Sequence, residues 1–233
     1  MTGGNGKRMG RDNQPKFRQA TELARRAGQR AGYERILIVS EGSKTEPLYL
    51  GEIRAEYRLN TANVQVQPSQ FGTTPLQVVE YAEHLFVEGD KTKNIERRAF
   101  EKVYAVFDRD DHTTYHDALK KADALDRKQL RNDLRRPVQF AAIASVPCFE
   151  LWLLLHFENA LHPLHRTEVY QRMRHYVPGY DKGQVGHYKQ TNKHLTVAMQ
   201  RARDLTQRTT AHNGAELYTD LHHLVSLLTT LKD

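Results

Sequence analysis

Acidic residues follow two runs of the sequence that are typical of buried strands, and acids in such places can hold a divalent cation. Glu41 comes just after the apolar run 36–39, and Asp108 and Asp110 follow the apolar run 103–107. The carboxyl ends of neighbouring parallel strands meet at one edge of an open sheet, where α/β folds bind ligands. Carboxylate oxygens suit Mg²⁺ or Mn²⁺, which would polarise a phosphodiester and activate water for in-line attack. Asp residues after strands are also common turn and N-cap residues.

Three further residues near these acids are candidates for the same site. Glu46 could be another metal ligand, or the second member of a capping box that begins at Ser43. Lys44, at the start of the same predicted helix, could neutralise charge that develops on a phosphate, or be an ordinary surface lysine. Glu150 lies in an otherwise apolar segment, so its carboxylate needs either a metal or a partner such as an arginine.

Alternating strand and helix patterns are the elements that would position these residues. Apolar or alternating runs predict strands at 36–39, 64–66, 103–107 and 138–144. Capping residues and apolar faces predict helices that begin near residues 43, 74 and 114. After residue 146 the pattern is helical, at 149–157, 168–176, 195–205 and 217–231. We therefore expect an α/β fold with a mostly parallel sheet in the order 2-1-3-4, flanking helices and a helical C-terminal extension.

The charge of the chain is concentrated in two segments. The 233 residues carry 35 Lys and Arg against 28 Asp and Glu, a net charge of +7. Residues 1–34 and 161–210 are basic, and the second segment interleaves tyrosines with its cations, a composition that suits nucleic acid but also an ordinary solvated helix face. The residues expected to contact nucleic acid are Arg109, His112, Arg172, Arg174, Lys182, Lys189 and Lys193.

Several classes of protein do not fit this sequence. The longest apolar stretch is far shorter than the roughly 18 residues of a membrane span, and no apolar signal segment occurs near the start. A single cysteine, Cys148, excludes an internal disulfide and a cysteine-rich zinc module. Without a GxxxxGK[ST] phosphate loop, ATP hydrolysis by this chain is not expected. We expect a cytoplasmic protein without a membrane association.

Three stretches of the chain resemble the signature motifs of the RloB family. They are IVSEGSKTEP at 38–47, VFDRDDH at 106–112 and PCFELWLLLHF at 147–157. This family belongs to prokaryotic restriction and abortive-infection loci and is similar to the Toprim superfamily. The resemblance covers about residues 35–158 and implies a Toprim-like Rossmannoid domain there. Composition and pattern on either side predict a flexible basic arm at 1–34 and a helical basic extension at 159–233. One departure is Ser40, where family members often have cysteine.

The resemblance also implies roles for the acids. Glu41 would be the strand-one glutamate, and Asp108 and Asp110 the pair that holds Mg²⁺ or Mn²⁺. The resemblance also favours Glu150 as a further ligand, whereas the case for Glu46 rests on its position alone. The resemblance implies defence against phage or foreign DNA, often beside an ATPase encoded nearby, and the compact chain is most similar to the nuclease branch of Toprim proteins. A homo-oligomer is left open.

These observations lead to a first hypothesis and two alternatives. The first is a metal-dependent nuclease acting on DNA or RNA and controlled by a partner ATPase, with Glu41, Asp108, Asp110 and Lys44 as catalytic residues. The second is a non-enzymatic module that binds nucleic acid or the ATPase, which predicts salt-dependent binding without a cleavage product. The third is a receiver-like signalling domain, disfavoured by the doubled aspartates and the basic C-terminal half.

Overall fold

The computed structural model describes residues 32–213 and 216–232. The basic arm expected at 1–34 lies almost entirely outside the described residues. From Tyr33 onward the chain forms one compact unit, an α/β fold as the sequence predicts. Among the described residues, no helix combines the length and the apolar character needed to traverse a bilayer.

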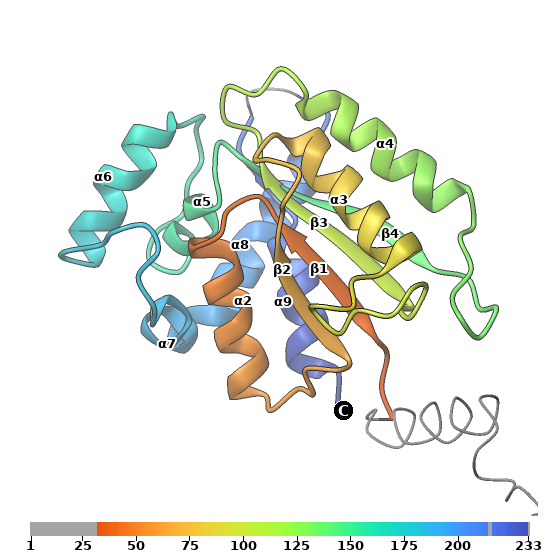
Figure 1. The fold of residues 1–233 in the computed structure, drawn as a ribbon. Coiled ribbons are helices and arrows are strands. Elements are labelled where there is room, and N and C mark those ends of the chain that lie inside the picture. Colours follow the sequence, from red (N-terminus) through yellow and green to blue (C-terminus); the bar gives the residue numbers. More distant parts are fainter. Residues whose placement is uncertain (1–31, 214–215, 233) are drawn as a thin grey trace, which may run out of the picture. The chain divides into compact units, whose positions relative to one another are not determined.

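A five-stranded sheet forms the centre of this unit (Figure 1). Its strands are β1 (Ile36–Ser40), β2 (Val64–Pro68), β3 (Lys102–Asp108), β4 (Gln139–Val146) and β5 (Tyr218–Thr219). The order is β2-β1-β3-β4-β5; the first four strands run parallel, and β5 is antiparallel to β4. The predicted order of the four parallel strands is confirmed. The helix expected at 217–231 is wrong at its start, where β5 lies, and α9 begins only at Leu221. A strand of two residues is too short to show a period in the sequence.

Helices flank the sheet on both faces (Figure 1). They are α2 (Thr45–Glu56), α3 (Pro75–Glu88), α4 (Tyr115–Arg127), α5 (Glu150–Leu154), α6 (Arg166–Tyr176), α7 (His187–Thr191), α8 (Leu195–Arg208) and α9 (Leu221–Thr230), with a 3₁₀ turn at Asn192–His194. The predicted capping box at Thr74 and Gln77 is present at the start of α3. The expected helix at 149–157 is wrong beyond Leu154, where the chain continues in tight turns.

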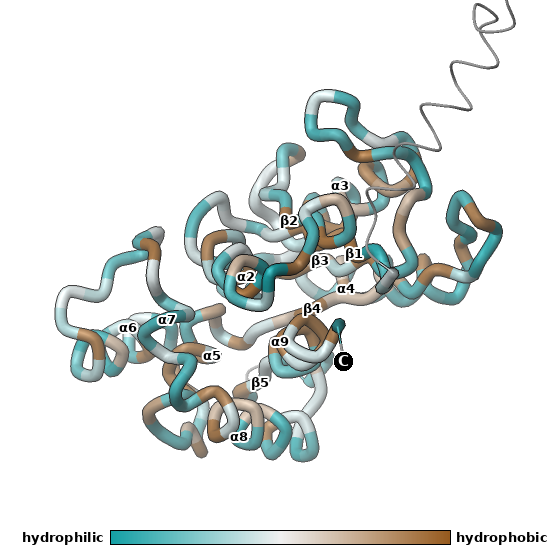
Figure 2. The backbone as a smooth tube through the Cα atoms, turned by 90° about the horizontal axis from the view of Figure 1, so that it is seen from below, coloured by the Kyte–Doolittle hydropathy of each residue, from teal (hydrophilic) through white to brown (hydrophobic). Residues whose placement is uncertain are grey.

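The two faces of the sheet pack against separate hydrophobic cores. In β1, Ile36 and Ile38 lie in one core, whereas Leu37 and Val39 lie in the other, as alternation along a strand requires. The first core joins the sheet to α2, α5, α6, α8 and α9, and the second joins it to α3 and α4. Figure 2 shows apolar stretches along the central strands and also along helices such as α9. Residues before and after position 158 therefore share the first core.

The capping box predicted at Ser43 is wrong. Lys44 is the N-cap residue of α2 and makes no side-chain capping bond. The Glu46 carboxyl is turned instead toward the loop after β1: a Cβ added at Gly42 would lie 2.6 Å from Glu46 Oε2. Glycine at position 42 thus leaves room for this acid beside the end of β1.

Candidate functional site

Glu41 and Asp108 meet at the carboxyl end of the sheet. β1 and β3 are paired in register, so the ends of the two strands lie side by side. The Asp108 backbone N–H donates to Glu41 Oε2 at 3.0 Å, and the Glu41 N–H donates to the Val106 carbonyl at 2.9 Å. The sheet topology therefore brings together two acids that are 67 residues apart in the chain.

Two helix starts bring further acids to the same place. Glu46 lies in the first turn of α2, and Glu150 is the first residue of α5. Glu150 is only 1% exposed. Glu41, Glu46 and Glu150 each contribute to the repulsion that acts on the Asp108 carboxyl. We call the set of Glu41, Glu46, Asp108 and Glu150 the acid cluster.

Burial and repulsion make ionisation costly for three members of the acid cluster, Glu41, Glu46 and Asp108. Burial is the largest cause, and it raises the pKa of Asp108 well above its usual range, with repulsion from Glu46, Glu150 and Glu41 adding to the effect. The pKa of Glu46 is raised to about 7, mainly by burial and then by repulsion from Glu150 and Glu41. The pKa of Glu41 is also raised by burial. Such a site favours either protons or an added cation.

Cationic and phenolic groups from the helical extension partly compensate Glu150. The Tyr180 hydroxyl donates to Glu150 Oε1 at 3.1 Å, and Lys182 Nζ lies 3.5 Å from the same oxygen. Burial alone would lower the pKa of Lys182, but attraction to Glu150 and Asp108 raises it. Lys182 Nζ also lies 4.7 Å from the centre of the Tyr170 ring. The second carboxylate oxygen, Glu150 Oε2, is buried without a hydrogen-bond partner among the described residues.

Asp110 lies near the acid cluster and is paired with an arginine of the helical extension. Its Oδ2 lies 3.1 Å from Nη1 of Arg166, the first residue of α6, and its Oδ1 is buried without a partner in the described part of the chain. Its backbone has a positive φ of 38°, so the chain leaves the extended conformation after Asp108. Asp110 stays close enough to repel Glu41.

The other residues predicted near the acids take three different positions. His112 Nε2 lies 3.3 Å from Glu41 Oε1. Arg109 turns toward α4, where its guanidinium lies 5.8 Å from the centre of the Tyr115 ring. Lys44 is exposed and packs against Gly183, since a Cβ there would lie 2.5 Å from Lys44 Cδ.

The predicted nucleic-acid contacts from the helical extension are mostly dispersed. Lys182 reaches the acid cluster, as described above. Arg172 is held by Glu158 and Glu168 in surface ion pairs at 2.9 and 2.6 Å. The remaining three lie exposed on α6, α7 and the 3₁₀ turn: Arg174, Lys189 and Lys193.

Sequence reasoning did not assign the residues that surround the acids. Tyr170 and Tyr180 belong to the aromatic interleaving of 161–210, yet no local pattern links them to Glu150. Arg166 follows a His-rich loop and has no motif around it. The contacts of Tyr180 and Lys182 with Glu150 join residues at least thirty apart in the sequence. They follow from the packing of α6 and the loop after it beside α5, which the sequence does not reveal.

The chemistry of the acid cluster fits a hard divalent cation. All of its donors are carboxylate oxygens, and Glu150 Oε2 is buried and unpartnered. Over residues 32–213 and 216–232, no three or more His, Cys, Asp or Glu side chains are already arranged as a metal-binding group. Carboxylates that repel one another separate in the absence of a cation, and binding one would draw them together.

Comparison with known proteins yields one match. The family described as RloB-like protein matches residues 36–228. No curated protein matches the chain, and no solved structure matches it. The matched region contains the whole acid cluster, the sheet and most of the helical extension. It covers well over half of the chain, which therefore belongs to the RloB-like family.

Proposed function

We propose that this protein is a nuclease that depends on Mg²⁺ or Mn²⁺ and cleaves a phosphodiester of DNA or RNA at the acid cluster. The observation that carries the proposal is the convergence of Glu41, Glu46, Asp108 and Glu150 at the carboxyl end of the sheet. Burial and repulsion raise the pKa values of Glu41, Glu46 and Asp108 there. A purely structural role would not require three buried acids and a half-buried one to lie close together, because replacement by apolar residues would remove the cost of burying their charges.

Each residue near the acid cluster has a distinct task in this proposal. The four carboxylates would hold the cation, which when bound polarises a phosphate oxygen and activates water. Lys182 Nζ and the Arg166 guanidinium supply positive charge beside the acids, where a phosphate diester carries its negative charge. His112 Nε2 holds Glu41 Oε1 in place. Lys44 is exposed between β1 and α2, close in sequence to Glu41 and Glu46, and is available to contact a phosphate of the substrate.

The biological setting belongs to the same proposal. We propose a role in defence against phage or foreign nucleic acid, with control by an ATPase encoded nearby. Membership of the RloB-like family supports this setting, as does the net charge of +7, which favours a polyanionic substrate.

A second candidate is a nucleic-acid-binding module without catalysis. The ion pair between Arg166 and Asp110 favours it, because Asp110 is engaged by a cation of the chain itself. In that case the protein would bind nucleic acid with a steep dependence on salt and release no product with any divalent ion.

Incubation with labelled single- and double-stranded DNA and RNA distinguishes the two candidates. The nuclease is expected to produce fragments in Mg²⁺ or Mn²⁺ and none in excess chelator. Adding the divalent ion back should restore cleavage. Salt-sensitive binding of every substrate, with no fragment from any of them in either metal, would favour the binding module and contradict the nuclease.

A further inference from the structure

We propose that residues 127–136, here called the arginine loop, form a second nucleic-acid site that binds the phosphate backbone at the end of the sheet opposite the acid cluster. The inference rests on the proposed function only in its choice of nucleic acid as the partner. The arginine loop lies within residues 35–160, a segment whose net charge is slightly negative. The net charge of that segment therefore does not reveal this local cluster of positive charge.

The arginine loop carries a local excess of positive charge. It contains five basic residues and one acidic residue, Asp133. All five cations are exposed, and none forms an ion pair with any described carboxylate. They are Arg127, Lys128, Arg131, Arg135 and Arg136. Exposed cations that lack carboxylate partners are available to phosphates.

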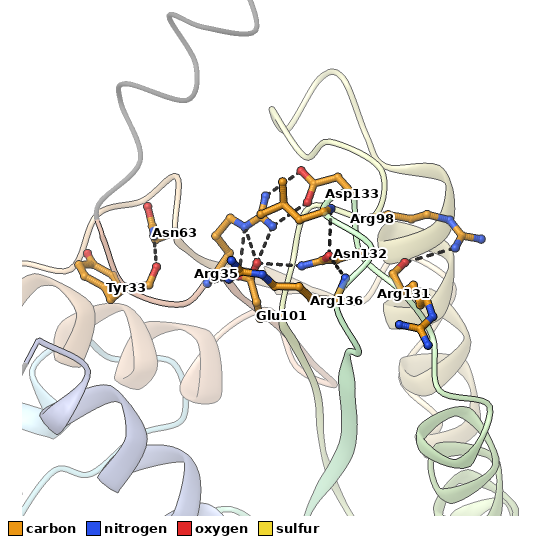
Figure 3. Close-up of polar contacts among 10 residues, drawn as sticks. Tyr33, Arg35, Asn63, Arg98, Glu101, Arg131, Asn132, Asp133 and Arg136 are labelled. Carbon is orange, nitrogen blue, oxygen red and sulfur yellow. Dashed lines mark hydrogen bonds and ion pairs between the residues drawn. The ribbon is translucent and has the colours of Figure 1, made fainter.

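Partly buried contacts hold the arginine loop in one shape (Figure 3). Arg35 Nη1 and Nη2 lie 2.8 and 2.7 Å from the two Asp133 carboxylate oxygens, and Arg35 also binds Glu101. Asn132 is 4% exposed; its Oδ1 accepts from the Leu134 and Arg136 N–H groups at 3.0 and 2.9 Å.

Two more contacts of Asn132 and Asp133 tie the arginine loop to the sheet. Asn132 Nδ2 donates to Glu101 Oε1 at 2.9 Å, and the Asp133 N–H donates to the Arg98 carbonyl at 2.7 Å. Asp133 is thus paired with Arg35 within the protein, and it shares Arg35 with Glu101. A surface that is already ordered loses little conformational entropy on binding.

The arginine loop and the acid cluster lie at opposite ends of the same strands. Arg35 and Glu101, which anchor the loop, directly precede β1 and β3, whereas Glu41 follows β1 and Asp108 ends β3. The seven residues of β3 extend about 23 Å. The arginine loop is therefore a separate surface and not a rim of the acid cluster.

The composition of the surface favours a phosphate backbone over a protein partner. Planar guanidinium groups bind phosphates with two parallel hydrogen bonds. Within residues 127–136 the one large hydrophobic side chain that is strongly exposed is Leu134, at 58%. Protein interfaces usually have an apolar and aromatic centre, which a single leucine does not provide.

Binding measured in chelator, where nothing is cleaved, tests this inference separately from the nuclease. The full-length chain is titrated into a labelled 30-nucleotide DNA and its duplex at several salt concentrations, followed by fluorescence anisotropy. The double variant Arg135→Gln and Arg136→Gln should flatten the dependence of log affinity on log salt by about 2. Its affinity at 0.1 M salt should fall about 10- to 60-fold. The control, Arg203→Gln with Arg208→Gln on α8, removes the same charge from exposed positions and should change affinity less than about threefold.

Three outcomes would overturn the inference. The first is an unchanged salt dependence in the loop variant. The second is an equal loss in the control variant, which would mean that only net charge matters. The third is a Leu134→Ser variant that weakens binding as much as the loss of two arginines, which would indicate an apolar docking surface. Unchanged melting temperatures show that the variants remain folded. Cleavage by the wild type in Mg²⁺ or Mn²⁺ decides the nuclease proposal independently of these results.

Discussion

Asp108→Asn and Glu41→Gln are each expected to lower kcat/KM for nucleic-acid cleavage by at least about a thousandfold, while the metal-free protein melts at or above the wild-type temperature. Catalysis should be lost because each substitution removes a carboxylate that would hold the cation. Stability should not be lost, because each substitution removes a charge that burial, complete for Asp108 and partial for Glu41, and nearby carboxylates disfavour. Cleavage assays in Mn²⁺ and thermal melts in chelator measure the two effects.

Asp111→Asn is the matched control for these variants. Asp111 lies in the same loop, but its side chain is 85% exposed and only distantly paired with Arg166, at 3.9 Å. Its replacement should change cleavage by less than about threefold, in line with the small effects of exposed charges. Full cleavage by both Asp108→Asn and Glu41→Gln would contradict the assignment of the acid cluster as the active site.

The metal-free protein is expected to lose stability as the pH rises through about 7. The folded-state pKa of Glu46 is raised from 4.5 to about 7, mainly by burial. Below pH 4.5 the carboxyl is protonated in both the folded and the unfolded chain, so it costs nothing. Above pH 7 the folded chain must hold a buried charge, which lowers the free energy of unfolding by about 3 kcal/mol relative to an unperturbed group.

Glu46→Gln isolates this contribution. Relative to wild type, the variant should gain about 2 kcal/mol more at pH 8.5 than at pH 5.5, or about 4–8 °C in melting temperature. Glu56→Gln, on the exposed end of the same helix, is the control and should follow the wild-type pH profile. If the melting temperatures of wild type and Glu46→Gln in chelator change with pH in parallel, the proposed effect of Glu46 on stability is contradicted.

The sequence predicts the parallel part of the sheet well because its signals are local and strong. Fully apolar runs such as 36–39 and 103–107 are typical of strands buried on both faces, and both are entirely buried in the structure. The strand order then follows from the general topology of open α/β sheets. This order is what placed Glu41 beside Asp108 in the prediction, and the hydrogen bond between them is a consequence of it.

The surroundings of the acid cluster could not be predicted in the same way. The orientation of Asp110 depends on a left-handed backbone position after β3 and on an arginine 56 residues further along, and neither has a local signal. Lys182 was expected to face nucleic acid because it lies in a basic segment. Its contact with Glu150 depends on the path of the loop between α6 and α7. The net charge of each segment likewise does not reveal the arginine loop. Asp and Glu residues elsewhere in 35–160 cancel its positive charge in the sum.

A direct titration of Mn²⁺ into the metal-free protein tests the central claim most sharply. At pH 8, where the carboxylates can ionise, isothermal calorimetry should show saturable binding to wild type. Asp108→Asn should bind more than about tenfold more weakly, because it lacks one of the carboxylates that would hold the cation. Asp111→Asn should bind like wild type. Equal Mn²⁺ affinity in wild type and Asp108→Asn, or no binding to either, would contradict the account that the buried acids form a metal site.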